Sequence, residues 1–515
     1  MSDGREIELK LGLAPDDMAR LSSHPPLALP AQAPPVRRSL ASVYFDTPDF
    51  ALARAGVALR VRSTGDGLVQ TVKAPGGGGA GLFDRPEWET ALPGAAPELD
   101  RAHLRATGLA PFADPALMAR LQPVFSTEIH RTTYRLGGAA EPDGEAWEVE
   151  AALDHGRVVA GERSEPICEV EFELVRGDPH RLFDLARQML AAVPVRPLSL
   201  SKSERGVRLA SGDGLRPVKA RVPVLNPRLG VGEAFQTIAR SCLDHLLVNE
   251  HCLLATGDGE AIHQMRVALR RLRSAIRLFR PVVEGPLLAE IGAELRWLLE
   301  RLGPARDAEV LRAEILAPVR AARPDDAGLA ALDAAAGRDL AGRLDVAVAA
   351  VRDRRFAALV LDLGAWIESG DWRAARAARL AEPIPPFARR RLAKITRRLL
   401  RQGGEDLLAL SPTERHEVRI RAKQARYVAE FFAALLPRKA VAGFIEDLAA
   451  LQDALGRLND LAVALPRLAA LPDPGAVAAA GRVAAWHRDG EADLLAEAAR
   501  GWRRLRQREM PWTER

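Results

Sequence analysis

The chain has 515 residues, of which 48% are hydrophobic and 27% charged, and its formal net charge is +5. This length exceeds what a single hydrophobic core usually supports, so we expect at least two domains. The sequence has no apolar run long enough to cross a bilayer, and its first residues lack the apolar stretch of a signal peptide. We therefore expect a cytoplasmic protein without a membrane partner, and three reduced cysteines, because their spacing is not that of metal ligands.

Residues 1–210 are predicted to form antiparallel strands. Eight short alternating segments, bounded by turn residues, indicate them: "EIELKL", "SVYFDT", "VALRVRS", "LVQTVKA", "PEWETAL", "EIHRTTYRL", "WEVEAALD" and "CEVEFELV". "PGGGG" at Pro75 to Gly79 and "PPLALPAQAPP" at Pro25 to Pro35 are predicted loops, and residues 211–230 a linker. Residues 231–510 repeat Ala, Leu and Arg with a helical period, which predicts an all-α domain.

Charged residues alternate along nearly every predicted strand. Glu6, Glu8 and Lys10 share one face of the first strand, because successive side chains point to opposite faces. The pattern recurs at Arg60 and Arg62, Lys73, Glu87 and Glu89, Arg131 and Arg135, Glu148 and Glu150, Asp154, and Glu169, Glu171 and Glu173. One explanation is a solvated sheet face. Such faces usually mix in neutral polar residues, however, whereas here some strands are wholly acidic and others wholly basic.

Lysine is rare in this chain, which makes its positions informative. Only 7 of the 73 basic residues are lysines, and the three that precede residue 211 (Lys10, Lys73 and Lys202) all lie in this charge pattern. A compact ammonium binds phosphate oxygen as a point charge. Mg²⁺ and Mn²⁺ take carboxylate and phosphate oxygens, and they stabilise the charge that develops in phosphoryl transfer. The pattern therefore predicts a closed sheet lined by acidic strands for a metal and basic strands for phosphate.

The ordered motifs "EIELK", "LRVR", "TVK", "EWE", "HRTTYR", "ALD", "CEVEFE" and "SKSER" resemble the CYTH, or triphosphate tunnel metalloenzyme, family over Met1 to about Leu209. The resemblance implies an eight-stranded antiparallel tunnel barrel with flanking helices. It also implies that Glu6, Glu8, Asp154, Glu169 and Glu171 hold the metal, Mg²⁺ or Mn²⁺. The triphosphate side would be Lys10, Arg60, Arg62, Lys73, Arg131, Arg135, Lys202 and Arg205.

The expected reaction is hydrolysis, in which water attacks the terminal phosphorus. Glu6, Glu8 and Lys10 are the predicted catalytic residues, although the sequence does not identify the general base. Two of the phosphate ligands have an alternative interpretation. Arg205 would instead be a surface residue that closes the last strand, and Arg135 would instead be a solvent-facing arginine. The remaining carboxylates of the pattern compete for few ligand positions.

A basic stripe marks the helical half. In "HQMRVALRRLRSAIR", a first stripe of His263, Arg266, Arg270, Arg273 and Arg277 lies on one helix face. Adding 153 gives a second stripe of His416, Arg419, Lys423 and Arg426, whereas Arg277 maps to Glu430. The offset also maps Phe279 to Phe432 and Asp307 to Asp460, which indicates a duplication and two pseudo-symmetric four-helix bundles. A solvated helix face is the alternative.

Several residues near the two stripes also have predicted roles. "SPTE" at Ser411 to Glu414 predicts a capping box, which places His416 near a helix N-terminus, where anions bind. Asp307 and Asp460 are expected either to orient the guanidiniums or to cap helices. Arg271 lies off the first stripe and is expected to face solvent.

"IHQMRVALRRLRSAIRLF", "LGPARD", "RHEVRIRAKQARYVAEFF" and "LQDALGRLND" resemble the CHAD domain over about Val231 to Arg508. The resemblance implies that the two stripes bind inorganic polyphosphate, and it favours inorganic triphosphate as the tunnel substrate. Association with polyphosphate granules is a further expectation. Nucleic acid is the competing partner for the stripes, and the alternatives for the barrel are a class IV adenylate cyclase, a thiamine triphosphatase and a non-catalytic binding protein. The sequence does not indicate an oligomeric state.

Overall fold

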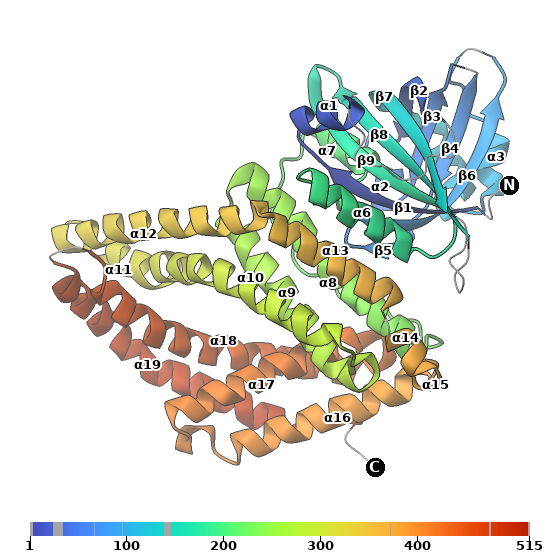
Figure 1. Cartoon of the computed structure of the whole chain (residues 1–515). Coiled ribbons are helices and arrows are strands. Elements are labelled where there is room, and N and C mark those ends of the chain that lie inside the picture. The colour runs from blue at the N-terminus through green and yellow to red at the C-terminus, as the bar shows by residue number, and fades with distance from the viewer. Residues whose placement is uncertain are drawn as a thin grey trace. The chain divides into compact units, whose positions relative to one another are not determined.

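The computed structural model describes residues 4–23, 34–65, 67–94, 96–138, 146–370, 372–472 and 475–512. The chain divides into two compact units (Figure 1): Met1–Arg216 with Asp353–Gly370, and Pro217–Arg352 with Asp371–Arg515. The division falls inside the predicted linker. It also assigns residues 353–370, predicted within the helical domain, to the first unit. The predicted loop at Pro25 to Pro35 lies outside the described residues except for its last two prolines.

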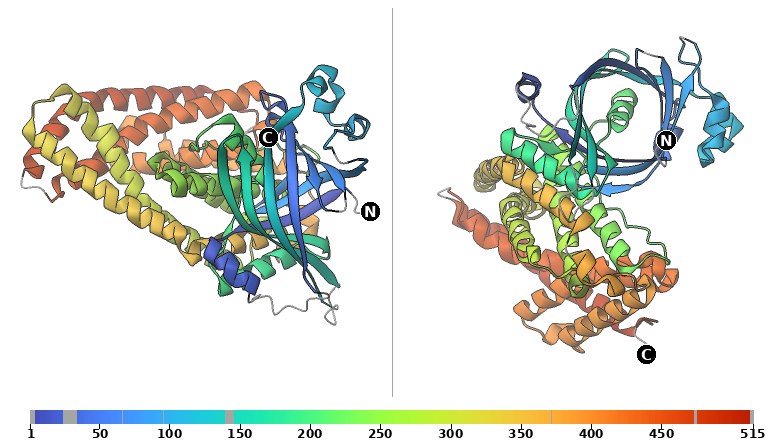
Figure 2. Two further views of the ribbon diagram at one scale, coloured as in Figure 1. Left: turned by 90° about the horizontal axis from the view of Figure 1, so that it is seen from above. Right: turned by 45° about the vertical axis from the view of Figure 1, so that its right-hand side comes forward.

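The first unit contains a closed antiparallel barrel of eight strands, which confirms the predicted fold class. The barrel strands are β1 (Arg5–Gly12), β2 (Val36–Asp46), β3 (Ala58–Ser63), β4 (Leu68–Lys73), β6 (Leu82–Leu92), β7 (Gln122–Gly138), β8 (Trp147–Ala160) and β9 (Arg163–Arg176). Their order is β1-β9-β8-β7-β2-β3-β4-β6, and β6 pairs with β1 to close the barrel. The ring is seen end-on in the right panel of Figure 2. Each of the eight predicted segments belongs to one of these strands.

The charged face of the barrel points inward, the reverse of an ordinary antiparallel sheet. Cross-strand pairs such as Glu8 with Glu173 and Lys10 with Glu171 hold the charged residues on one face. The alternate residues of β3 and β4, Leu59 and Val72 among them, lie in a hydrophobic cluster with residues of short outer helices. These helices are α2 (Ala51–Arg54), α3 (Arg101–Ala106), α4 (Ala110–Ala113) and α5 (Pro115–Ala119). Because the apolar face is covered from outside, the charged face lines the interior, and the solvated-face explanation is wrong.

Two further helices pack on the barrel strands, and a third packs on one of these helices. They are α1 (Pro15–Ser23), beside β8 and β9, α6 (His180–Ala192), beside β1 and β9, and α13 (Arg354–Ser369), beside α6. Nδ1 of His180 and Oγ of Ser369 lie 2.9 Å apart, and Arg187 pairs with Asp362. Gly364 has no room for a Cβ, which would lie 2.4 Å from the ring of Phe183. This packing explains why α13 belongs to the first unit.

Helix α7 (Lys202–Ser211) packs against the inward face of the barrel. Val207 and Leu209 join a cluster with Phe125 and Ile129 of β7, and Gly206 lies so close to Phe125 that a Cβ would be 2.1 Å from its ring. The capping box of Ser201 and Glu204 fixes the first turn. The motif "SKSER" therefore begins a helix and does not close the last strand, and it brings Lys202 into the barrel.

The predicted glycine loop is partly a strand. Gly77–Gly79 forms β5, which pairs with β6, and Arg196–Pro197 forms the short β10, which pairs with β1. A Cβ on Gly76 would lie 2.1 Å from the carbonyl oxygen of Asp84, and Gly78 has a φ of +120°. Only glycine allows this close approach, so the prediction of a loop was wrong for residues 77–79.

The second unit consists of helices arranged as two similar series. The first is α8 (Val231–Thr256), α9 (Gly259–Val283), α10 (Leu287–Val310) continued by the π-helix η1 (Leu311–Leu316) and α11 (Ala317–Ala322), and α12 (Ala327–Arg352). Short α14 (Trp372–Ala375) and α15 (Ala377–Leu380) precede the second: α16 (Ile384–Gly403), η2 (Leu407–Ala409), α17 (Pro412–Phe431), η3 (Ala433–Leu435), α18 (Arg438–Ala469) and α19 (Ala476–Gln507). The starts of α16 and α17 follow those of α8 and α9 by 153 residues, in agreement with the predicted duplication.

Each four-helix group takes two helices from each repeat. The first group is α8, α9, α16 and α17, and its centre holds the contacting rings of Phe235, Phe279, Phe387 and Phe432. The second group is α10 with η1, α12, α18 and α19, and its core contains Leu316, Leu332, Leu468 and Val483. The two repeats are therefore interleaved, and neither forms a bundle by itself. None of the described helices has the length and apolar character needed to cross a membrane.

Candidate functional site

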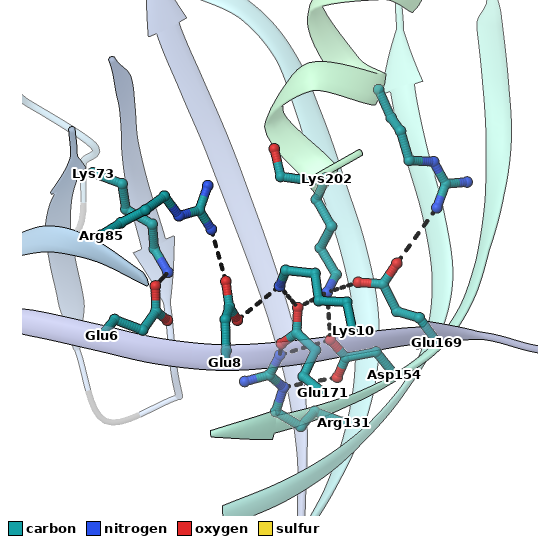
Figure 3. Close-up of polar contacts among 12 residues, drawn as sticks. Glu6, Glu8, Lys10, Lys73, Arg85, Arg131, Asp154, Glu169, Glu171 and Lys202 are labelled. Carbon is teal, nitrogen blue, oxygen red and sulfur yellow. Dashed lines mark hydrogen bonds and ion pairs between the residues drawn. The ribbon is translucent and has the colours of Figure 1, made fainter. Parts of the chain in front are cut away.

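Three buried carboxylates gather inside the barrel. The acidic cluster consists of Asp154 on β8 and Glu169 and Glu171 on β9, and one oxygen of each lies within 4.8 Å of the others. Their exposed fractions are 0%, 0% and 8%. The ammonium of Lys202 lies among them, 2.7 Å from Asp154 and 2.8 Å from Glu171, and also pairs with Glu169 (Figure 3). Because burying bare carboxylates is costly, the cluster requires a cation.

Further cations surround the acidic cluster. Arg131 donates from Nε and Nη2 to the two oxygens of Asp154, at 2.7 and 2.6 Å, and also pairs with Glu171. Lys10 bridges Glu171 and Glu8, at 2.7 Å from the latter. Burial alone would raise the pKa of Glu171, but Lys10, Lys202 and Arg131 outweigh it and hold that pKa well below its ordinary value. Burial likewise opposes Lys202 and Arg131 at Asp154, whose pKa is lowered. These two carboxylates are thus ionised at neutral pH.

A second charged group lies on β1, β4 and β6. Lys73 pairs with Glu6 and lies 3.5 Å from Glu87, and Arg85 donates to Glu8 at 2.7 Å (Figure 3). Sequence reasoning missed Arg85. The signal was available, because Arg85 precedes Glu87 by two residues and therefore shares its face. The guanidinium of Arg85 also stacks over the ring of Phe83, at 4.6 Å from the centroid.

The opposite wall is basic, and its Arg60 has a carboxylate nearby, that of Glu87 at 3.9 Å. Arg60 and Arg62 of β3 lie beside Tyr44 of β2, a residue that the sequence did not single out. Burial, together with the charges of Arg60 and Arg131, lowers the pKa of Arg62 to about 10. Nε of Arg60 on this wall, like Nε of Arg85 on β6, is buried and has no hydrogen-bond partner in the described part of the chain. Unpaired buried donors beside surplus positive charge are what a polyphosphate anion requires.

The remaining carboxylates of the pattern differ in setting. Burial, and then the charges of Glu6 and other neighbouring carboxylates, raise the pKa of Glu173 to about 7, although Lys73 opposes this. Glu89 accepts a hydrogen bond from Thr71 at 2.8 Å, and Glu150 lies between Arg135 and Glu173 in the register. Glu148 pairs in register with Gly137 and Arg176, next to a β-bulge in β8. None of the four joins the acidic cluster.

Two predicted phosphate ligands lie outside the central group. The side chain of Arg135 is exposed, as its alternative allowed. Arg205 lies on α7, where Nε donates to Glu165 at 2.7 Å and Nη1 lies 3.5 Å from Glu169. It therefore supports the acidic cluster from the helix, and it neither closes a strand nor lies free at the surface.

The composition of the acidic cluster fits a hard divalent cation. All its donors are carboxylate oxygens, which suit Mg²⁺ and Mn²⁺, and no sulfur or imidazole lies in the cluster. Glu8 is linked to it through Lys10, and Glu6 lies farther along β1 with Lys73. The structure thus brings Glu8 and Lys10 to the acidic cluster. Glu6 lies one inward-facing position farther along β1, where it pairs with Lys73.

The two basic stripes lie on neighbouring helices of the first four-helix group, α9 and α17. Burial is the main cause that lowers the pKa of both Arg419 and Lys423 on α17, and the charge of Arg270 on α9 contributes to both shifts. The shared influence of Arg270, together with the packing of α9 on α17, indicates that the middles of the two stripes lie close together. Nδ1 of His263, Nε of Arg266 and Nε of Arg419 are buried without a partner in the described chain.

Asp258 is the N-cap of α9, and Ser411 is the N-cap of α17, where it forms the predicted capping box with Glu414. Arg266 lies 3.8 Å from Asp307, as expected for a carboxylate that orients the stripe, and Asp460 acts electrostatically on Arg419. Nδ1 of His416 lies 2.7 Å from Oδ1 of Asn459. The pKa of His263 falls to about 4 through burial and the charge of Arg306, and that of Lys423 falls to about 7. Both shifts reflect buried positive charge without enough anions.

The ends of the stripes differ from their middles. Arg277 is exposed, and Arg273 is half-buried. Arg426 donates to Gln452 and Glu430, each at 3.0 Å, so it is partly neutralised. The strongest uncompensated charge therefore lies at the middle of the two stripes.

The prediction that Arg271 faces solvent was wrong. Arg271 is 4% exposed and forms a buried ion pair with Glu430 of α17. Its guanidinium also lies over the rings of Tyr427 and Phe431, at 5.6 and 5.0 Å from their centroids. Arg271 lies off the stripe and points toward α17, the helix that corresponds to α9 in the second repeat.

Comparisons with known proteins support this division of the chain. The CYTH domain model matches residues 4–207, and the CHAD domain model matches residues 237–469. A Haemophilus influenzae protein described as inorganic triphosphatase is 35% identical over 208 residues, which are 40% of this chain and 55% of the relative. An uncharacterized Mycobacterium tuberculosis protein is 30% identical over 285 residues, 53% of this chain and 52% of the relative. The matches thus span about half the length of these relatives.

A solved structure matches the helical unit. The crystal structure of the CHAD domain from the plant Ricinus communis is 31% identical, with a TM-score of 0.50, and the match covers 57% of this chain and 99% of that one. The match supports the helical arrangement of α8 to α19.

Proposed function

The chain carries a CYTH domain followed by a CHAD domain, and we propose that it hydrolyses inorganic triphosphate in the barrel and binds inorganic polyphosphate along the two basic stripes. One observation supports the first part above all. A closed barrel holds three buried carboxylates on β8 and β9, and it holds on β3 and β6 two arginines, Arg60 and Arg85, whose buried Nε atoms have no hydrogen-bond partner among the described residues. The relative described as inorganic triphosphatase matches over the same region.

Different residues of the barrel interior would bind the metal and the phosphate. Asp154, Glu169, Glu171, Glu8 and Glu6 would hold Mg²⁺ or Mn²⁺, which lowers the pKa of bound water and screens phosphate charge. The phosphate ligands would be Lys10, Arg60, Arg62, Lys73, Arg131 and Lys202, with Arg135 and Arg205 at the periphery. The ammoniums of Lys10 and Lys202 neutralise the carboxylates in this structure, and they would turn to phosphate oxygens when a metal takes over that role.

Electrostatic stabilisation by these fixed cations is the main contribution of the barrel to catalysis. Charge develops on phosphate oxygens as the terminal phosphorus is attacked, and donors already positioned there need no reorganisation. Arg60 and Arg62 hold the non-reacting phosphates, and Arg131, fixed by both oxygens of Asp154, keeps its orientation. Glu6, Glu8 and Lys10 stand on one strand between the two walls, and we propose them as the catalytic row.

A substrate comparison tests the barrel function. Phosphate release is measured from inorganic triphosphate, ATP and thiamine triphosphate with Mg²⁺ and with Mn²⁺. We expect the highest kcat/KM for inorganic triphosphate, because the described interior offers cations on several walls but no recognised place for adenine or thiazolium. Formation of cyclic AMP and pyrophosphate from ATP would instead favour a cyclase, and no product from any of the three would favour a binding protein.

The polyphosphate proposal follows from the two stripes. Three buried nitrogens without partners and a lysine with a pKa of about 7 indicate an anion site. We expect polyphosphate to outcompete single-stranded DNA of equal charge, since no aromatic residue lies within 263–277 to stack on bases. The variant His263→Ala/Arg270→Ala should weaken polyphosphate binding while triphosphate hydrolysis continues. Equal competition by DNA would instead favour nucleic acid as the ligand.

Polyphosphate binding should weaken as the pH rises through 7. The pKa of Lys423 is lowered by burial and then by Arg419, Arg270 and Arg426, with Asp460 opposing them. A bound polyanion favours the charged amine and raises this pKa, so binding takes up a proton wherever free Lys423 is neutral. We therefore expect constant affinity below pH 7 and, above it, up to about a tenfold loss per pH unit. Titration calorimetry in buffers of different ionisation enthalpy measures the proton uptake.

The variant Lys423→Arg provides the control for this pH dependence. Arginine keeps its charge across this range, so the variant should bind with a shallower pH profile and less proton uptake above pH 7. An unchanged profile would show that Lys423 does not titrate with binding.

A further inference from the structure

Helix α16 carries an unusual excess of positive charge. Its 20 residues include seven Arg and Lys and no Asp or Glu. Six of these cations are exposed, and five of the six lie within one third of the helix circumference. We name these five the outer stripe: Arg390, Lys394, Arg397, Arg398 and Arg401. From first to last they extend about 16 Å along the helix axis. None of them belongs to the two stripes on α9 and α17.

Most of the outer stripe has no ion-pair partner in the part of the chain that the structure describes. Arg390 lies 3.4 Å from Glu382, but Lys394, Arg397, Arg398 and Arg401 form no ion pair within the described ranges. Other arginines of the helical unit do find partners: Arg312 pairs with Asp333, Arg482 with Asp326 and Arg508 with Asp447. Like charges three and four residues apart destabilise a helix. The outer stripe is thus maintained at a cost to the helix.

The duplication shows that the outer stripe is not a requirement of the fold. Subtracting 153 takes its five positions to Thr237, Ser241, Asp244, His245 and Val248 of α8, and none of these is Arg or Lys. Both helices nevertheless pack in the same four-helix group. The positive charge is therefore a property of the second repeat alone.

The outer stripe runs toward the end of α17 where the second stripe begins. Helices α16 and α17 pack against each other and are joined by residues 404–411, so the C-terminal end of α16 lies beside the N-terminal end of α17 (Figure 1). Arg401 is in the last turn of α16, and His416 is in the second turn of α17. One extended anion could thus pass from the second stripe at His416 to Arg401 and on along α16.

The composition of α16 limits the chemistry of the partner. It has no exposed aromatic residue for stacking on bases, and its apolar residues Phe387, Leu392 and Leu399 are buried in the helical unit. A membrane-surface helix would need those residues to enter the lipid. A flexible chain of phosphates needs only the row of cations.

We infer that α16 provides an outer binding surface for inorganic polyphosphate, which engages the part of a long chain that extends beyond the stripes of α9 and α17. The inference rests on the proposed polyphosphate binding. Its consequence is a dependence of affinity on chain length. A short chain occupies α9 and α17 alone, whereas a long chain also gains the outer stripe as a tethered second contact, which raises the apparent affinity without altering the first site.

The test compares short and long polyphosphate on the full chain. The variant Arg390→Gln/Lys394→Gln/Arg397→Gln/Arg401→Gln removes four charges from exposed positions. We expect it to bind the long chain about 10²-fold more weakly, with a smaller dependence on salt concentration, and to bind the short chain as the wild type does. The control Arg323→Gln/Arg338→Gln/Arg488→Gln/Arg500→Gln removes the same charge from other exposed positions and should lose little affinity for either chain.

The outcomes separate the inference from the function on which it rests. Binding of short chains by the wild type with no gain for long chains would overturn the outer surface and leave the α9 and α17 site standing. The same holds if both quadruple variants lose affinity equally, because net charge alone would then be responsible. No binding of either chain would overturn the proposed function itself. If the quadruple variant of the outer stripe loses binding only to duplex DNA or only to anionic vesicles, the outer stripe binds that partner and the inference is overturned.

Discussion

We expect Glu171→Gln to lower kcat/KM for triphosphate hydrolysis by about 10²- to 10³-fold, the loss typical when one preorganised electrostatic group is removed. Glu171 joins the two halves of the site, since Lys10, Lys202 and Arg131 all pair with it. The amide has nearly the same shape but no charge. It would weaken metal binding and release three cations from their positions. Phosphate release under saturating and limiting metal measures both effects.

A matched control lies on the outer face of the same barrel. Glu128 on β7 is exposed and pairs with Arg157 at 2.7 Å. Glu128→Gln also removes one carboxylate from a barrel strand, but it should leave kcat/KM within about twofold, because exposed pairs contribute little. Near-wild-type activity of Glu171→Gln, or an equal loss in both variants, would contradict a role of the acidic cluster in hydrolysis.

We expect Glu430→Ala to destabilise the helical unit by about 3–5 kcal/mol, because it leaves the buried charge of Arg271 without its partner. The pair joins α9 to α17, and Glu430 also accepts a hydrogen bond from Arg426 at 3.0 Å. The loss should also weaken polyphosphate binding, since the separation of the two stripes depends on how these helices pack. Urea unfolding followed by circular dichroism measures the first effect, and titration with polyphosphate the second.

Two further variants isolate the cause. Glu284→Ala breaks the exposed pair with Arg280, at 3.2 Å, and should cost no more than about 1 kcal/mol. The double variant Arg271→Met/Glu430→Leu removes both buried charges and should recover most of the stability lost in Glu430→Ala. If Glu430→Ala and Glu284→Ala were equally stable, the buried pair would not hold α9 to α17.

The strand pattern of the first unit was readable from the sequence because it follows a period of two. Charged residues alternate with apolar ones along each strand, and the three lysines of this half all lie in that charge pattern. The residues of the interior face could therefore be inferred one by one. The sequence could not show that Lys202 would stand among Asp154, Glu169 and Glu171. That position depends on the packing of α7 against the inward face of the barrel, a tertiary contact made by Val207, Leu209 and the close approach of Gly206 to Phe125.

In the helical unit, the sequence predicted the internal repeat but not the packing of its helices. An offset of 153 residues revealed the duplication, since it rests on identity of sequence and not on packing. The offset could not show which helices would share a core, and the two repeats are interleaved. Arg271 was misjudged for the same reason. Its position off the stripe was correct, but its partner Glu430 stands 159 residues away on a helix whose neighbourhood only the fold determines.

The most direct test of the proposed function is phosphate release from inorganic triphosphate by the purified full chain. Wild-type protein is compared with Glu6→Gln/Glu8→Gln, each with Mg²⁺, with Mn²⁺ and with a chelator. We predict release by the wild type that requires the metal and is lost in the double variant, while both proteins bind polyphosphate equally. No release from wild-type protein, or metal-independent release that is the same in the two proteins, would contradict a metal-dependent triphosphatase in the barrel.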